Sequence, residues 1–491
     1  MRSIPVVLLA TAISLPATTQ AAPWLGPGDA RARYSAQALA DAGALNRTRS
    51  TWPLMWANLQ KRDESPESAA DTAHTYLSFE KRQQAQRGWR ATTTLSGATN
   101  ERLVRGFDTT PDESAQLSAT VQWQGQHWAA GLSPAYTQNP QDDKDWRLDG
   151  SYLAATVGNW VIGAGSLDRW WGPGWQSSLI LSNNARPLPA IWLNRRNARA
   201  PQSDWLSWMG PWDFTLFAGE MESSRTVPEA RLVGMRLTLR PVQGLDIGFS
   251  RILQLDGKGR PGDASTYWDA LIGKDNRQEG KANDPGNQLG AIDIRYGFKA
   301  SETTTLGLYT QMVGEDEAGQ LPAKKSWLFG VDATSALAGG KQQWYLETTN
   351  TITDDLFGDT LPGVTYEHSI YTTGYRYRGR SMAASQGGDA EITTIGAWHF
   401  LPGGSQIGAS VTRAKLNQFG AIGQDTPTNG SIEYLVPAAD QDFTQTTVSY
   451  GTEILKGWLN MEARYASKAP MLRNGNDLSE WQIGGEWRYR F

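Results

Sequence analysis

Three stretches of the chain combine arginine, aromatic and asparagine side chains in a pattern suited to binding sugars. Aromatic rings stack on the apolar faces of sugars, and planar guanidinium and amide groups bind their hydroxyl and carboxylate oxygens. The first stretch runs from Asp168 to Arg186, the second holds Arg195, Arg196 and Arg199, and the third is Tyr375–Arg380. The candidate glycan-binding residues are Arg169, Trp170, Trp171, Asn183, Asn184, Arg186, Tyr375, Arg376, Tyr377 and Arg378. The alternative is that the tryptophans pack inside the protein and the arginines neutralise loop carboxylates.

Catalytic and metal-binding patterns have little support. The four histidines, His74, His127, His368 and His399, stand at no metal-ligand spacing, and the chain has neither a cysteine nor a Gly-x-Ser-x-Gly motif. The acidic run Gly314–Gly319 lacks the oxygen-ligand spacing of calcium loops, which favours a solvated loop tip. Hydrolysis of lipid or glycan would need a nucleophile with a neighbouring base. We therefore expect no metal, no cofactor and no enzymatic activity.

Composition narrows the class of protein. The chain has 491 residues, no cysteine, 22 tryptophans and a formal net charge of −4, a balance that makes nucleic acid an improbable partner. A mean hydropathy of −0.49 leaves no room for a bundle of transmembrane helices. Arg2, the apolar run 4–15 and the small residues up to Ala21 are typical of a secretory signal peptide, residues 1–21. An exported chain without disulfides must gain stability from burial or from closing a sheet on itself.

The segment that follows, residues 22–86, has a helical pattern. Tyr34, Leu39 and Leu45 are spaced as on one helix face, 50–53 is a break, and Ser65 before a proline places the start of a second helix. The segment is small and amphipathic. We expect a periplasmic helical lid packed on a larger body.

From Arg87 to the last residue the pattern has a period of two, which predicts strands with one apolar and one polar face. Tight turns alternate with long polar segments, as in barrels of the outer membrane. This places about eighteen antiparallel strands, starting near 87, 114, 127, 146, 160, 177, 212, 229, 244, 287, 303, 326, 341, 389, 405, 441, 458 and 479. The least certain strand is 177–194, and an extra strand pair within 366–382 would raise the count to twenty.

Two features favour a membrane barrel over a soluble β-sandwich. Trp128, Trp160 and Trp458 each stand just after a tight turn, where an interfacial aromatic belt would lie. The chain ends on Trp487, Tyr489 and Phe491, which resembles the C-terminal signal read by the barrel-assembly machinery. The sequence thus predicts an all-β transmembrane barrel, residues 87–491, in the outer membrane of a Gram-negative bacterium, in contact with outer-membrane lipid and monomeric.

An eighteen-stranded barrel is wide enough for an aqueous channel unless something fills it. The predicted inward face carries charges of both signs, among them Arg236, Asp293, Arg295, Glu462 and Arg464. These charges can pair with one another, or they can conduct a charged solute or oligosaccharide. A helical segment at the periplasmic mouth argues against a porin with an open channel.

Four stretches identify a family. Residues 168–189 (DRWWGPGWQSSLILSNNARPLP), 287–296 (NQLGAIDIRY), 311–319 (QMVGEDEAG) and 369–382 (SIYTTGYRYRGRSM) resemble the Wzi family of outer-membrane capsule-assembly proteins, and 50–54 (STWPL) fits the helical N-terminal part of that family. The matches are spread over the whole mature chain. The loops 256–286 and 416–440 match no known pattern.

The resemblance implies an eighteen-stranded barrel with a periplasmic helical bundle that acts as an outer-membrane lectin. Family members anchor exported capsular polysaccharide or exopolysaccharide at the cell surface and organise it there, and they are not known as enzymes. An acidic polysaccharide would suit arginine-rich outer segments electrostatically. A channel for a charged solute or oligosaccharide is the alternative function, which conductance in planar bilayers would distinguish.

Overall fold

The computed structural model describes residues 23–491 apart from 60–69, 85–86, 109–110, 112, 272–285, 319–320, 355–357 and 428–429. The predicted signal peptide and the predicted start of the second helix at Ser65 lie outside these residues. The three α-helices of the described part are α1 (Ala30–Asp41), α2 (Ala70–Gln84) and α3 (Ala264–Leu271). Among them none is long and apolar enough to cross a membrane.

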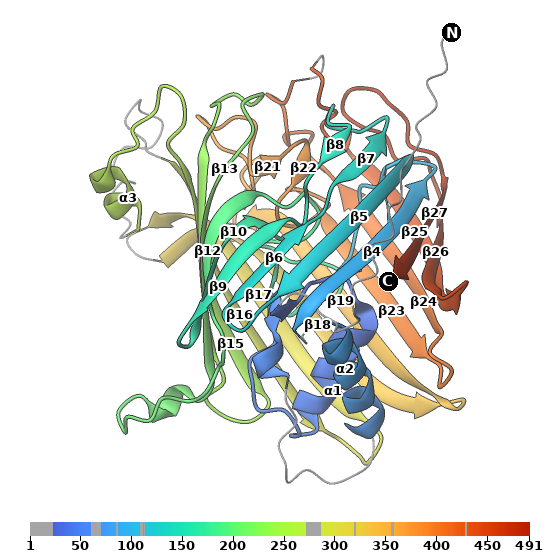
Figure 1. The fold of residues 1–491 in the computed structure, drawn as a ribbon. Helices are drawn as coiled ribbons and strands as arrows, with labels where there is room; N and C mark the ends of the chain where they lie inside the picture. The colour runs from blue at the N-terminus through green and yellow to red at the C-terminus, as the bar shows by residue number, and fades with distance from the viewer. Residues whose placement is uncertain are drawn as a thin grey trace.

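A closed antiparallel barrel forms the body of the molecule (Figure 1). β6 and β7 form one bent strand along β5, β8 and β9 form the next, and β20 only flanks β19, so the wall has eighteen strands. The barrel closes where β27 pairs with β4. The strands are β4 (Gly88–Ala98), β5 (Ala115–Gln124), β6 (Trp128–Leu132), β7 (Ala135–Gln138), β8 (Trp146–Arg147), β9 (Tyr152–Val157), β10 (Trp160–Ser166), β12 (Pro189–Arg195), β13 (Trp212–Glu220), β14 (Arg231–Leu239), β15 (Leu245–Leu255), β16 (Gly286–Lys299), β17 (Thr305–Ala318), β18 (Leu321–Leu337), β19 (Gly340–Asp354), β20 (Thr360–Leu361), β23 (Glu391–Phe400), β24 (Gln406–Leu416), β25 (Gln441–Ile454), β26 (Gly457–Ala466) and β27 (Trp481–Arg490).

The polarity of the wall is that of a membrane barrel. In β16, Ile292 and Ile294 are 38% and 40% exposed, whereas Asp293 and Arg295 are 1% and 3% exposed. The apolar residues therefore face outward and the charged residues face the lumen. A soluble protein would instead bury the apolar face.

The predicted strand pattern is confirmed, with three local corrections. The strand predicted at 177–194 begins only at Pro189, because the preceding residues enter the lumen. Within 366–382 the structure has only the short hairpin β21 (Arg376–Tyr377) and β22 (Arg380–Ser381), which is not part of the wall. The acidic run expected to be a loop tip extends strand β17 to Ala318.

Two of the three tryptophans expected in an aromatic belt lie on the outward face of the wall. Trp128 is 54% exposed at the start of β6, and Trp160 packs on Phe214 with its ring centroid 6.3 Å away. Trp458 instead lines a groove on the lumen side, beside Arg488 and Arg490. It stands out of phase with Leu459 and Met461, so its neighbours in β26 face outward while it faces inward.

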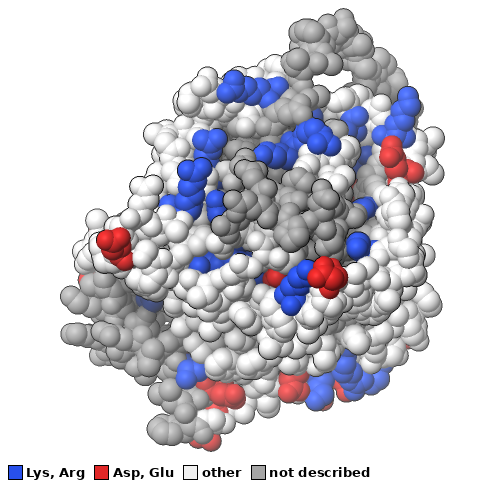
Figure 2. Space-filling view, turned by 90° about the horizontal axis from the view of Figure 1, so that it is seen from below, with Lys and Arg blue, Asp and Glu red and all other residues white. Residues whose placement is uncertain are grey.

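The two ends of the barrel differ. At one end, the short-turn end, most strands are joined by tight turns, and α1 and α2 lie there (Figure 1). Seen along the axis from that end, the surface shows more basic than acidic side chains (Figure 2). At the other end, the long-loop end, β21 and β22 lie among the long connections. Outer-membrane barrels place short turns in the periplasm and long loops outside.

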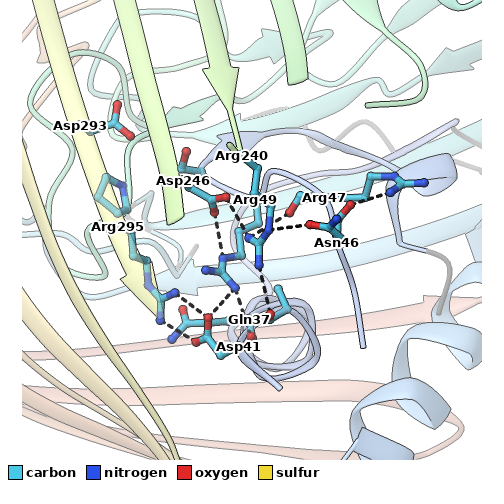
Figure 3. A network of polar contacts seen from close by, with 12 residues as sticks. Gln37, Asp41, Asn46, Arg47, Arg49, Arg240, Asp246, Asp293 and Arg295 are labelled. Carbon is cyan, nitrogen blue, oxygen red and sulfur yellow. Dashed lines mark hydrogen bonds and ion pairs between the residues drawn. The ribbon is translucent and has the colours of Figure 1, made fainter. Parts of the chain in front are cut away.

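Helix α1 is buried in the lumen and does not merely cover its mouth. Asp29 caps its start by accepting the Ala32 amide at 2.9 Å, and nearly every residue of the helix is buried. Gln37 donates to Asp332 on β18 at 2.6 Å. Arg295 on β16 binds both oxygens of Asp41, at 2.9 and 2.8 Å. Buried carboxylates and guanidinium groups thus fix the helix to the wall (Figure 3).

Several other lumen charges also pair within the protein. Arg236 binds Asp293 at 2.6 Å, and Arg240 binds Asp246 at 2.9 Å. Arg49, from the turn after α1, contacts both Asp41 (2.7 Å) and Asp246 (3.1 Å), which links the helix to β15 (Figure 3). Pairing of this kind neutralises the inward face.

Candidate functional site

The first candidate stretch folds into the lumen and is held there by two wall residues. The Glu347 carboxylate accepts the Trp175 and Ser177 amides, both at 2.7 Å, and the Tyr309 hydroxyl at 2.9 Å. The Gln311 side chain accepts the Leu179 amide at 2.7 Å. The three amide contacts satisfy backbone groups that entry into the barrel would otherwise leave unpaired, and the Tyr309 hydroxyl helps to hold the Glu347 carboxylate in place. The described part of the stretch thus fills the lumen.

The aromatic residues of this stretch are packed in the interior. Trp170 and Trp171 form β11 (Trp170–Trp171), which pairs with β2 (Thr51–Trp52) of the N-terminal segment, and the two side chains are 1% and 0% exposed. The Arg169 guanidinium lies 4.4 Å from the ring centroid of Phe217. The structure therefore places these three candidates where they contact protein.

The two candidate asparagines tie loops together. Asn183 donates to the Phe107 carbonyl at 3.0 Å, and Asn184 donates to the Ser381 carbonyl at 2.8 Å. Both side chains are buried. They join the lumen segment to the loop after β4 and to the hairpin β21–β22.

The third candidate stretch lies against the first. The Tyr375 hydroxyl donates to the Ile180 carbonyl at 3.0 Å, and its side chain is fully buried. Arg376 donates to the Thr373 carbonyl at 3.0 Å and pairs with Glu367. The structure thus brings together two predicted stretches that are about two hundred residues apart in the chain.

Two candidate arginines meet at one carboxylate. Asp142, in the loop after β7, pairs with Arg186, with Arg147 at 2.9 Å and with Arg378 at 3.5 Å. Arg378 also donates to the Tyr377 hydroxyl at 3.2 Å. Burial alone would raise the pKa of the Asp142 carboxyl, but the guanidinium groups of Arg186 and Arg147 hold that pKa below its usual range. The side chains of Arg186 and Arg378 keep exposures of 17% and 20%.

The second candidate stretch is at the wrong end for recognition at the long loops. β12 runs antiparallel to β10, and Arg195 pairs in register with Trp160, which follows a tight turn. Arg195, Arg196 and Arg199 therefore lie at the short-turn end. The antiparallel pairing of β12 with β10 fixes this position.

A polar cleft opens at the long-loop end beside the hairpin β21–β22. Its volume is about 780 Å³, and four connections line it: those after β4, β7, β24 and β26. The polar lining side chains include Asn100, Glu101, Asn139, Gln141, Ser431, Glu433, Arg473, Asn474, Asn476 and Asp477. None of these residues was among the predicted site residues. The polar run 474–477 is visible in the sequence, but so are many turns like it.

The third candidate stretch supports the wall of this cleft. The Gln141 side chain donates to the Arg378 carbonyl at 3.1 Å, and the Leu435 amide donates to the Gly379 carbonyl at 2.9 Å. Arg380 pairs with Glu101 at the edge of the cleft. Gly379 has a φ of +84°, and a Cβ there would lie 2.4 Å from the Glu433 carbonyl oxygen, so only glycine fits. The third candidate stretch, Tyr375–Arg380, therefore sets the position of the cleft residues.

Hydrogen bonding inside the cleft favours a ligand rich in hydroxyl groups. Asn474 and Asn476 donate to the Glu433 carboxylate at 3.1 and 2.6 Å. All three side chains remain at least partly exposed. Carboxylate and amide oxygens accept from hydroxyl groups, and amide nitrogens donate to them. No cluster of three or more potential metal ligands occurs among the described residues.

The family model for the capsule assembly protein Wzi matches residues 84–479. A protein of Klebsiella pneumoniae, known as an uncharacterized 55.8 kDa protein in the cps region, is 30% identical over 319 residues. This match covers 64% of the present chain and 63% of the length of the relative.

A solved structure has the same fold. It is that of Wzi from Escherichia coli, an outer-membrane protein involved in group 1 capsule assembly and a carbohydrate-binding β-barrel. The TM-score is 0.80 at 24% sequence identity, and the match covers 95% of the present chain and 99% of the other.

Proposed function

The chain belongs to the Wzi family of capsule assembly proteins, and we propose that it is an outer-membrane lectin that binds exported capsular polysaccharide or exopolysaccharide and holds it at the cell surface. The polar cleft at the long-loop end supports this proposal most directly. It lies on the side that faces the medium in a barrel of this orientation. It is large enough for a few sugar units, and its lining offers carboxylate and amide groups.

The cleft suits sugar hydroxyl groups better than sugar carboxylates. The arginines of the third candidate stretch are engaged by protein carboxylates: Arg376 by Glu367, Arg378 by Asp142 and Arg380 by Glu101. Arg473 is the one basic side chain among the lining residues of the cleft. Glu433 and Asp477 add negative charge to the lining. We therefore assign sugar contact to the cleft lining.

The ten residues predicted from sequence receive two roles in this proposal. Arg186 and Arg378 are partly exposed at the edge of the binding face and can meet the glycan. The other eight hold the loops that carry the cleft: Arg169, Trp170, Trp171, Asn183, Asn184, Tyr375, Arg376 and Tyr377.

We propose that the wall contacts outer-membrane lipid, that the barrel-assembly machinery inserts the chain, and that it works as a monomer that binds without catalysis. Segments of the described chain fill the lumen, namely α1 and the stretch after β10, and this filling favours a lectin over an open channel.

A cleft variant tests the proposal. Glu433→Gln removes a charged acceptor while keeping the size of the side chain. Because a hydrogen bond to a charged group contributes about 1.5–3 kcal/mol, we expect the affinity for the polysaccharide to fall by about tenfold or more. The measurement is binding of purified polysaccharide to the purified protein, together with the amount of polysaccharide retained by cells.

The matched control is Glu229→Gln. Glu229 is also a carboxylate on a long-loop connection, where it pairs with Lys258 at 2.7 Å away from the cleft. We expect its affinity to be unchanged. Equal affinities for the two variants would contradict the placement of the sugar in the cleft.

A further inference from the structure

One connection at the short-turn end is not a tight turn. Residues 196–211 join β12 to β13 and contain the 3-10 helix η2 (Ser207–Met209). The other connections at this end are tight, such as those between β9 and β10 and between β18 and β19. This connection is much longer than two neighbouring strands require, which indicates a further role.

The base of the segment is fixed to the barrel. The Asn197 amide donates to the Asn159 side chain at 2.9 Å, and Asn159 donates to the Asn197 carbonyl at 3.0 Å. The Ala198 amide donates to the Asn58 side chain at 2.8 Å. These contacts give the segment a defined direction as it leaves the wall.

The tip of the segment presents two tryptophans to its surroundings. Trp205 is 76% exposed and Trp208 is 63% exposed. The hydrogen bonds recorded for the tip are internal, such as those from the Ser207 hydroxyl to the Asp204 carbonyl at 2.8 Å and from the Met209 amide to the Leu206 carbonyl at 3.0 Å. The tip is thus ordered by itself and leaves large apolar rings uncovered. Two exposed indoles three residues apart in the chain make this tip a candidate interaction surface.

The position of the segment restricts what can cover these rings. In Figure 1 the green segment below β12 and β13 extends sideways from the lower rim, away from the barrel axis. The adjacent wall is apolar, with Ile191 at 66% exposure. Lipid covers that wall, so a tip that projects sideways at its rim meets the headgroup layer of the periplasmic leaflet. Indole rings partition into that layer because it is apolar on one side and wet on the other.

Charge also fits a phospholipid surface. The segment 196–211 has two basic residues and one acidic residue, Asp204. Arg196 and Arg199 are exposed, and no carboxylate pairs with them among the described residues. Arg47 is a further basic group near Arg199, and burial together with the Arg199 charge lowers the pKa of Arg47. Basic side chains are common on this face (Figure 2), and anionic headgroups attract them.

We propose that residues 196–211 form a lateral anchor that inserts Trp205 and Trp208 into the periplasmic leaflet of the outer membrane, with Arg196 and Arg199 on anionic phospholipid headgroups. The anchor holds the barrel at a fixed depth and orientation in the bilayer. The inference depends on the barrel lying in a membrane but not on the polysaccharide, so its test is separate from that of the lectin.

The absence of cysteine allows a site-specific test. Ser203→Cys keeps both tryptophans and places a nitrobenzoxadiazole probe on the tip; Trp205→Cys places the probe at the ring itself. The protein is reconstituted in nanodiscs of phosphatidylcholine and phosphatidylglycerol, with or without 5-doxyl phosphatidylcholine. We expect quenching by the doxyl lipid, protection from iodide and a blue-shifted emission, since interfacial side chains lie about 5–10 Å into the headgroup and acyl boundary.

The control is Arg82→Cys on α2, an exposed position at the mouth of the barrel. Its probe should be quenched by iodide and not by the doxyl lipid. The pair of substitutions Arg196→Glu and Arg199→Glu, added to Ser203→Cys, should increase iodide quenching at the tip.

Two results would overturn the anchor. If the Ser203 and Trp205 probes were as open to iodide as the Arg82 probe, the tip would be free in the periplasm. If they were shielded from both quenchers and the cysteines formed crosslinks between copies, a second copy of the chain would be the occupant.

Discussion

The substitution Asp41→Asn is expected to release helix α1 from the lumen. The Asp41 carboxylate is fully buried and binds Arg295 through both oxygens, at 2.9 and 2.8 Å, and Arg49 at 2.7 Å. Asparagine has nearly the same shape but no charge. Two buried guanidinium groups therefore lose the carboxylate that they share (Figure 3).

The size of the effect follows from what each arginine retains. Breaking a buried ion pair costs about 3–5 kcal/mol because an uncompensated charge remains. Arg295 keeps Asp332 at 2.7 Å, and Arg49 keeps Asp246 at 3.1 Å. These remaining pairs place the loss at the lower end, about 3 kcal/mol. The population with an undocked helix should rise about a hundredfold, since 1.4 kcal/mol is a factor of ten.

Trypsin cleavage in the α1 segment measures that population, because cleavage follows the open state when closing is fast. Arg31 and Arg33 supply cleavage sites within the helix. A heat-dependent gel shift verifies that the barrel is intact. Conductance in planar bilayers then shows whether release of the helix opens the lumen.

The control is Glu302→Gln at the same end of the barrel. Glu302 pairs with Lys299 at 3.0 Å, but its side chain is 81% exposed, and exposed pairs contribute about 0–1 kcal/mol. Its cleavage rate should equal that of the unmodified protein. Equal rates for the Asp41 and Glu302 variants would refute the role of the buried network in docking the helix.

Two further outcomes are expected at the long-loop end. Arg376→Ala combined with Arg378→Ala should lower the amount of cell-bound polysaccharide, because the loop behind the cleft loses its pairs with Glu367 and Asp142. The heat-dependent gel shift of the barrel should be unchanged. Full retention of polysaccharide would remove this loop from the site. The folded-state pKa of Asp142 lies below its ordinary 3.8, so its ion pairs contribute stability that is present above pH 3.8 and is lost as the pH falls through the folded-state value. Hydrogen exchange of the loop 139–149, corrected for intrinsic rates, should rise in that acid window and should show no such rise in Asp142→Asn.

The wall of the barrel was predictable from the sequence because successive residues of a strand point to opposite faces of the sheet. Ile292, Asp293, Ile294 and Arg295 alternate along the chain and point alternately to the outside of the barrel and to the lumen. Pairing of each strand with its neighbour is local, so eighteen strands could be counted from their turns. The inward position of Trp458 could also have been inferred from the sequence, because Trp458 and the outward-facing Met461 are an odd number of residues apart in β26. What did not follow from local phase was where a long connection goes after it leaves the wall.

The candidate site depended on those connections. Residues 168–189 and 369–382 carried part of the family resemblance. In the structure most of their arginine, aromatic and asparagine side chains pack or pair inside the protein. Arg378 meets Asp142 across 236 residues, and Arg295 meets Asp41 across 254. The cleft lining comes from four loops, none of which carries a pattern of its own.

By itself, the sequence determined a membrane barrel and its strand order, because these depend on a period of two and on short turns. The stretches that resemble the Wzi family determined the family. Only the tertiary structure decided which polar groups remain free for a ligand. A buried charge must find a partner at close range, and that partner is set by how the loops fold into the lumen, over separations that no local pattern records.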